Sequence, residues 1–318
     1  MNWQAAQPVW ASLAPVFLLI GAGVVAGRMQ WVREGAIQDL SNLCFMLLIP
    51  SLLFRTMSSV RVEEVDLLPI AVYFPVALSV FAVQVGWFGF TAEGIVKALG
   101  GTFANMVMIG ITLVELAYGK SGLVTLLTLV SVHALIVLTV ATIALELAVA
   151  RQNGHAAEPK HRSGVLATVA RGLKGLLLHP IPLPIMAGLL FAQTGLTLPE
   201  QVDRPLALLG QAFGPISLVL MGVTLAGQNL RATWRPAVAV VLFKNLVLPL
   251  AVAVVAWWAG VRGVAYTVMV VAAGLPIGAN AFIFAQRYRV AQDITTSAMG
   301  LSTVMALVTL SAIMLLLA

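Results

Sequence analysis

Residues 274–280 read Gly-Leu-Pro-Ile-Gly-Ala-Asn and lie inside an apolar run that extends from 264 to 286. The run is long enough to cross a bilayer as a helix. Pro276 cannot donate a backbone hydrogen bond and clashes with the preceding turn, and the flanking glycines weaken the helix further. Broken backbone at bilayer depth is tolerated only where it is buried in protein or lines a watery cavity. We therefore expect a broken membrane-spanning helix here.

A second break is expected in an earlier apolar run, 94–118, which contains Gly101, Asn105 and Gly110. An Asn stands at each of the two breaks, Asn105 and Asn280, and its side-chain amide both donates and accepts hydrogen bonds. Two half-helices that begin at such breaks point their positive ends inward, and the freed main-chain amides can hold an anion. An ordinary proline kink with a packing glycine is the alternative for either run alone. Matched breaks in both runs favour a binding site.

The composition predicts a membrane protein. Hydrophobic residues make up 60% and charged residues 9% of the 318, and a soluble domain cannot hide that much apolar surface from water. The net charge of +6 comes from Lys and Arg in short gaps between apolar runs, which is how topology determinants are distributed, so no nucleic-acid partner is expected. The single cysteine, Cys44, excludes a disulfide framework or a multi-cysteine metal site. The first apolar run is too long for a signal peptide and is interpreted as a retained span.

Ten apolar runs of about 20 residues predict an all-α polytopic fold with ten membrane-spanning helices. The runs lie near 9–28, 36–57, 67–90, 94–118, 121–149, 173–195, 206–227, 236–259, 264–286 and 294–317. A polar segment, 151–172, divides them into two sets of five. Residues 1–150 and 173–318 are therefore expected to be two repeats, joined by a cytoplasmic linker.

Positive charge predicts the orientation of the spans. With both termini outside, twelve of the 18 Lys and Arg residues fall in gaps on the inner side and five in gaps on the outer side, while Lys244 lies within a span. We expect a multi-pass protein of the inner (plasma) membrane with its N- and C-termini outside. Because each half has an odd number of spans, the halves are expected to be inverted relative to each other.

Three pairs of similar short motifs support an internal repeat. They occur in the same order at nearly constant separation, around Pro50 and Pro215 (165 residues apart), Asn105 and Asn280 (175 apart), and Ser131 and Ser302 (171 apart). Inverted repeats are a hallmark of secondary transporters, which bind their substrate at the repeat interface. The pattern therefore predicts a transporter.

Three ionisable residues inside the apolar runs are candidates for function. An intramembrane cation such as Lys244 is costly, and it either pairs with a carboxylate or compensates a bound anion. The alternative is that Lys244 extends its side chain to the inner interface. Glu115 and His133 are candidates for ion coupling. A solvated helix end is the alternative for Glu115, and a packing role is the alternative for His133.

The stretch 273–288 strongly resembles the ninth span of the auxin efflux carrier family, which includes plant auxin exporters and bacterial carriers for malonate, malate and similar acids. Supporting similarity lies in 48–54, in 215–222 and at Lys244 with Pro249. The resemblance implies ten spans in two inverted five-helix repeats. Spans one, two, six and seven would form a scaffold, often dimeric. The other six would form a moving core in which spans four and nine cross.

By position, the resemblance implies that Asn105, Pro276 and Asn280 are the crossover residues. The residues expected to bind substrate are Asn105, Asn280, Pro276, Gly278, Thr112 and Lys244. The sequence departs from the family at Thr112, which stands where the fourth span of the family usually has proline. The departure predicts a shallower break in that span.

The leading interpretation is a secondary active transporter for a small mono- or dicarboxylate that works by alternating access. Proton coupling is favoured because few buried carboxylates are present to surround sodium with oxygen ligands. Sodium coupling through backbone carbonyls, as resemblance to bile-acid symporter-type folds suggests, is the alternative. An intramembrane enzyme would need a paired carboxylate, a Ser/Lys dyad or a metal cluster, and none is visible. A membrane sensor would need a signalling domain, for which the chain has no room.

Overall fold

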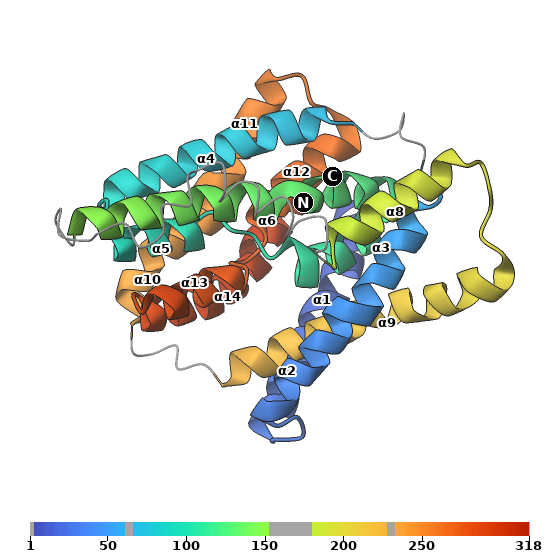
Figure 1. The fold of residues 1–318 in the computed structure, drawn as a ribbon, viewed down its shortest axis with the longest axis horizontal. Helices are drawn as coiled ribbons and strands as arrows, with labels where there is room; N and C mark the ends of the chain where they lie inside the picture. The colour runs from blue at the N-terminus through green and yellow to red at the C-terminus, as the bar shows by residue number, and fades with distance from the viewer. Residues whose placement is uncertain (1–2, 61–65, 153–179, 228–232, 318) are drawn as a thin grey trace.

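The computed structural model describes residues 3–60, 66–152, 180–227 and 233–317, and the regular elements in these ranges are all helices (Figure 1). Seven helical stretches in the described part are long and apolar enough to cross a membrane. They are Val9–Arg28, Gly35–Met57, Leu68–Phe88, Met106–Arg151, Glu200–Ala226, Trp234–Trp258 and Gln292–Leu317. Two shorter apolar helices, Pro182–Gln193 and Gly263–Gly274, accompany them. The prediction of an all-helical, multi-pass membrane protein is confirmed.

The first half of the chain begins with one long helix and continues through interrupted ones. Its elements are α1 (Trp3–Arg28), α2 (Glu34–Leu43), the π-helical turn η1 (Cys44–Leu48), α3 (Ile49–Met57), α4 (Leu68–Phe88), α5 (Ala92–Gly100), the π-helical turn η3 (Met106–Gly110) and α6 (Ile111–Gln152). The predicted runs 94–118 and 121–149 meet at Gly119, where α6 has non-helical backbone with φ 60°. Gly119 therefore marks the boundary between these two runs.

The second half has a similar series of helices. Its elements are α8 (Pro182–Gln193), α9 (Glu200–Ala226), α10 (Trp234–Leu242), the π-helical turn η5 (Phe243–Val247), α11 (Leu248–Trp258), α12 (Gly263–Gly274), α13 (Asn280–Tyr288) and α14 (Gln292–Leu317). The predicted linker 151–172 lies outside the described residues except for its first two, which still belong to α6. The start of the predicted run 173–195 also lies outside them.

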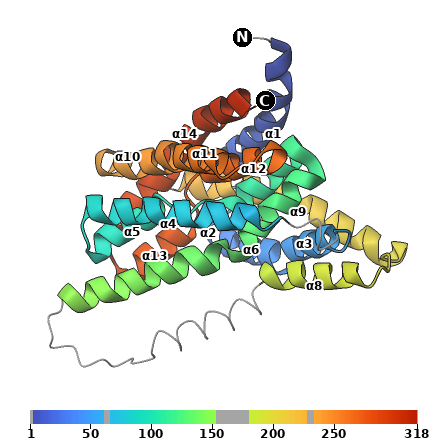
Figure 2. The same cartoon turned by 90° about the horizontal axis from the view of Figure 1, so that it is seen from above.

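The helices form two groups. Helices α1, α3, α8 and α9 pack together on one side of the molecule, and α4, α5, α10, α11, α12 and α14 pack together on the other. Figures 1 and 2 show this division from two directions, with α3, α8 and α9 at one side and α4, α5, α10 and α13 at the other. Helix α6 contacts both groups, η3 contacts α9 of the first group, and α1 contacts α14 directly.

The first group is held by a direct contact between the backbones of α1 and α9. A Cβ atom on Gly23 would lie 2.0 Å from the carbonyl oxygen of Val219, and one on Gly222 would lie 2.0 Å from that of Ile20. Only glycine permits so close an approach of two helices. Glycine at positions 23 and 222 is therefore explained by the packing of these two helices.

Two of the π-helical turns end two residues before a proline, Pro50 after η1 and Pro249 after η5. Proline removes the backbone donor that an α-helix would supply at that position. In each turn the chain instead makes a bond that spans five residues, from Ile49 to Cys44 and from Leu248 to Phe243. The second of these turns carries Lys244 and Asn245 into the interior.

Candidate functional site

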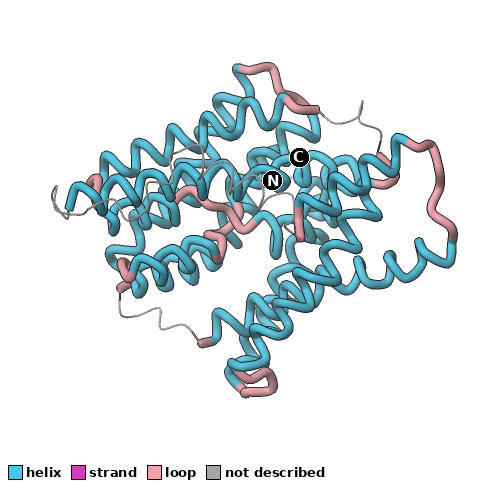
Figure 3. Tube along the Cα trace, in the orientation of Figure 1, coloured by secondary structure: helices cyan, strands magenta, loops and turns pink. Residues whose placement is uncertain are grey.

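The two predicted breaks meet near the middle of the molecule. Residues 101–105 join α5 to η3, and residues 275–279 join α12 to α13 (Figure 3). Ala104 and Ile277 form an antiparallel bridge. The Asn105 amide donates to the Pro276 carbonyl at 2.8 Å, and the Gly278 amide donates to the Phe103 carbonyl at 2.9 Å. Two segments far apart in sequence thus satisfy some of each other's backbone hydrogen-bonding groups.

The first break is not shallower than the second, because each spans five residues. The expectation drawn from Thr112 is wrong for a local reason. The chain leaves the helix at Gly101, well before position 112, and helical structure has already resumed when it reaches Thr112. The Thr112 side chain instead faces α9, where a Cβ on Gly214 would lie 3.0 Å from its hydroxyl oxygen.

Gly278 permits the close approach of the two breaks. A Cβ atom there would lie 2.7 Å from the Phe103 ring and 3.1 Å from the Ala104 carbonyl oxygen. Gly110 has a similar place on the other side, where a Cβ would lie 2.7 Å from Cδ1 of Leu275. Glycine at these positions is therefore explained by packing of the crossing itself.

Asn105 caps the half-helix that follows the first break. Its side-chain oxygen accepts a hydrogen bond from the Met108 amide at 3.2 Å. Its side-chain nitrogen lies 3.8 Å from Sδ of Met221 in α9. The side chain is buried, and both its oxygen and its nitrogen already have a partner within the protein.

Four main-chain amides at the starts of the two half-helices remain without a hydrogen-bond partner among the described residues: those of Met106, Val107, Ala279 and Asn280. Ala279 is exposed, and Val107 and Asn280 are half-buried. The Asn280 side chain makes no hydrogen bond in this part of the structure either. Unpaired amides at a helix N-terminus attract negative charge.

Lys244 lies on the far side of the second break. It is fully buried, and its Nζ donates to the Ala273 carbonyl at 2.5 Å, at the end of α12. The alternative in which the side chain reaches the membrane interface is therefore wrong. Neither ion pair found in the described residues, Arg55–Asp203 or Lys97–Glu93, includes Lys244. Its positive charge has no carboxylate partner there.

The two coupling candidates have different surroundings. Glu115 is exposed. His133 is buried, and its Nε2 accepts a hydrogen bond from the Ala104 amide at 3.3 Å. Its ring contacts those of Phe103 and Phe74, with centroids 4.5 and 6.0 Å away. His133 thus contacts the first break directly.

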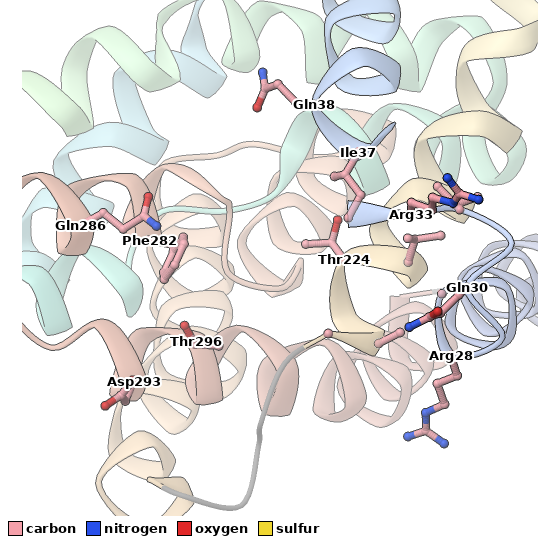
Figure 4. Close-up of a pocket in the computed structure, with 15 residues that line it drawn as sticks. Arg28, Gln30, Arg33, Ile37, Gln38, Thr224, Phe282, Gln286, Asp293 and Thr296 are labelled. Carbon is pink, nitrogen blue, oxygen red and sulfur yellow. The ribbon is translucent and has the colours of Figure 1, made fainter. Parts of the chain in front are cut away.

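An open cavity of about 1330 Å³ separates the two groups of helices on one side of the molecule. Figure 4 shows Gln286 and Phe282 of α13 on one wall and Gln30 on the opposite wall. Arg28 and Arg33 line the cavity, and Asp293 is the one acidic residue among the described residues of its lining. The described part of the lining therefore holds two basic side chains and one acidic side chain.

A smaller apolar cavity of about 210 Å³ adjoins the large one. The two share Val32 and Val223, and the smaller cavity follows α9 at Pro215 and Ile216. On the same stretch of α9, Ser217 donates to the Met108 carbonyl at 3.1 Å. Helix α9 thus lies between the cavities and the half-helix that begins at Asn105.

A family model described as membrane transport protein matches residues 8–314. The chain belongs to this family. This membrane transport protein is thereby a member of the auxin efflux carrier family. It is also 26% identical, over 314 residues, to a protein of Rhizobium meliloti (strain 1021) named "Putative malonate transporter". That similarity covers 94% of this chain and 93% of the relative.

Sequence reasoning missed several contacts of this membrane transport protein. Ser302 accepts from the Ile277 amide at 3.2 Å and donates to Asn245 at 2.6 Å, and the Asn245 side chain reaches the Gly274 carbonyl at 3.4 Å. Ser302 was visible only as a member of a repeated motif. The sequence contains no signal that Asn245, next to the conspicuous Lys244, holds the end of α12.

Proposed function

We propose that this protein carries a small organic anion, a mono- or dicarboxylate, across the inner membrane by alternating access. The observation that supports this most is the pair of breaks that cross at Ala104 and Ile277 and leave the amides of two half-helix starts unpaired. A carboxylate has two oxygens that can accept from such amides, and both helix ends favour its charge. Asn280 stands beside the second set of amides with an uncommitted side chain.

The substrate class is supported by the relative named as a malonate transporter. Malonate carries two carboxylates, and either of them could accept from the unpaired amides of Ala279 and Asn280 at the second break. Lys244 adds a buried positive charge close to the second break. In a low-dielectric interior such a charge stabilises an anion that is bound several ångströms away. We therefore place Asn105, Asn280, Pro276 and Gly278 at the site, with Thr112 at its margin and Lys244 as charge compensation.

We propose that the chain has ten spans in two inverted halves, 1–150 and 173–318, with residues 151–172 as a cytoplasmic linker and both termini outside. Support comes from the excess of Lys and Arg in the gaps assigned to the inner side and from the similar order of helices around the two breaks. In this orientation the large cavity opens to the cytoplasm. Helices α1, α3, α8 and α9 would form a scaffold that dimerises, and the remaining helices would move against it.

Proton coupling is proposed over sodium coupling. Within the described residues no group of three or more His, Cys, Asp or Glu side chains is placed to hold a metal ion. Of the two coupling candidates, Glu115 is exposed, and His133 contacts the first break. Sodium held by backbone carbonyls at the breaks is the alternative.

Purified protein in liposomes tests these proposals together. Labelled malonate and a panel of mono- and dicarboxylates are offered with a proton gradient alone and with a sodium gradient alone. We expect uptake of at least one carboxylate, driven by the proton gradient and lost in Asn280→Ala. Accumulated substrate should be recovered chemically unchanged, as for a carrier that is not an enzyme. Absence of uptake of every carboxylate by folded protein would refute the function, and uptake driven by sodium alone would refute the proposed coupling.

A further inference from the structure

The two central amides of the crossing point away from each other. In an antiparallel bridge of the kind formed by Ala104 and Ile277, the hydrogen bonds run between the flanking residues, from Asn105 to Pro276 and from Gly278 to Phe103. The amides of the bridged pair itself are directed outward, to opposite edges of the two-segment ribbon. A sheet would supply another strand at each edge. Here the crossing has no further strand among the described residues, so each amide needs another acceptor.

One buried side chain supplies that acceptor at each edge. His133 in α6 accepts from the Ala104 amide through Nε2 at 3.3 Å, and Ser302 in α14 accepts from the Ile277 amide through Oγ at 3.2 Å. Both acceptors are more than nine-tenths buried. Each comes from the long helix that follows its own break, 29 residues later in the first half and 25 residues later in the second. The two contacts thus repeat between the halves with different chemical groups.

We propose that His133 and Ser302 are equivalent positioning residues that fix the crossing from its two edges. The inference rests on the proposed function, because the crossing is where the anion would bind. Each side chain acts through the backbone. It holds one break in an extended conformation, and this conformation orients the unpaired amides of the next half-helix toward the anion. Both side chains are buried at the edges of the crossing, and each contacts a backbone amide of a break.

The protonation of each acceptor follows from its partners. Nε2 of His133 accepts, so the neutral ring carries its proton on Nδ1. Tyr73 on α4 faces the ring edge-on, with centroids 6.3 Å apart. A proton on Nε2 would break the bond to Ala104, so a positioning role competes with proton carriage by this histidine. Ser302 donates its own proton to Asn245 at 2.6 Å, which leaves its oxygen free to accept.

Hydrogen exchange of the full-length protein tests the inference independently of transport. His133→Ala should accelerate amide exchange in peptides that cover 101–105, and Ser302→Ala should do so in peptides that cover 275–279, each by about tenfold or more because a buried amide loses its only acceptor. His133→Gln and Ser302→Thr keep an acceptor oxygen and should restore protection. Two controls are matched to these sites. Tyr73→Phe removes an unpartnered hydroxyl next to the same ring, and Ser311→Ala removes a serine on α14 that bonds within its own helix.

Transport kinetics supply the second measurement. In the two alanine variants we expect KM for the carried carboxylate to rise by about tenfold, with rescue by His133→Gln and Ser302→Thr. Unchanged exchange in folded His133→Ala and Ser302→Ala would overturn the inference, as would folded His133→Gln and Ser302→Thr proteins that exchange as fast as the alanine variants. If the alanine variants do not fold, the rescue variants alone decide between these outcomes. If wild-type protein carries no carboxylate, the proposed function fails, and the exchange data still judge the positioning role.

Discussion

Asn105 and Pro276 lie 171 residues apart in sequence, and the amide of the first donates to the carbonyl of the second at 2.8 Å. Each residue stands where its own helix is interrupted. The bond therefore joins the two interruptions into one structural unit. A substitution in either segment should change the structure of the other.

Gly278→Ala should weaken this unit. The added methyl group would meet the Phe103 ring at 2.7 Å and the Ala104 carbonyl at 3.1 Å, so one segment must move. We expect a loss of about 1–3 kcal/mol in stability and a lower maximal rate of transport. Thermal unfolding in detergent and liposome uptake measure the two effects. Gly86→Ala in α4 is the control, since a Cβ there meets nothing within 4 Å; equal behaviour of the two variants would contradict the packing argument.

Asn105→Ala and Asn280→Ala should differ in their effect on stability. Asn105 caps η3 through the Met108 amide, so its removal should cost about 1 kcal/mol of folding free energy. Asn280 makes no side-chain hydrogen bond in the described part of the chain, so its removal should leave the melting temperature nearly unchanged. In both variants the rate of uptake should fall by about tenfold or more, because a side-chain amide that binds the anion is lost. Asn280→Ala with full uptake would remove Asn280 from the site.

Lys244→Met should separate stability from affinity. Methionine fills a similar volume without a buried charge, and replacing a buried charge with an apolar group is often neutral or stabilising. We expect a melting temperature equal to or above that of wild type. We also expect the affinity to fall, relative to wild type, more for dicarboxylates than for monocarboxylates. Calorimetric titration of each substrate measures the difference. Lys97→Met, which removes a partly exposed lysine paired with Glu93, is the control and should leave both affinities unchanged.

Arg28→Gln and Arg33→Gln should slow the capture of anions. Both residues line the large cavity, and long-range attraction of a charged solute raises its local concentration. We expect KM for uptake from the cavity side to rise by about two- to fivefold at low ionic strength, and the difference from wild type to vanish at high salt. Lys120→Gln, remote from that lining, should have no such effect. A rise in KM that persists at high salt would argue for a direct contact instead.

The sequence predicts this fold well where local chemistry decides it. Pro276 with its flanking glycines marks the second break within a few residues, and the apolar runs locate the helices. Thr112 misled the expectation for the first break because that break is produced upstream, around Gly101. The acceptors His133 and Ser302 could not be assigned from sequence, since each meets its amide only through tertiary packing of a helix more than twenty residues away. The cavity could not be predicted from sequence either, because its walls come from helices in both halves.

The touching backbones of α1 and α9 restrict how this protein can change shape. At Gly23 and Gly222 no side-chain layer separates the two helices, and a small sliding step would drive one main chain into the carbonyl groups of the other. These two helices are therefore expected to move as one rigid body. The displacement that transfers a solute from one face of the membrane to the other must occur elsewhere, at interfaces such as that between α9 and η3, where one serine hydroxyl bridges the gap and can exchange its partner.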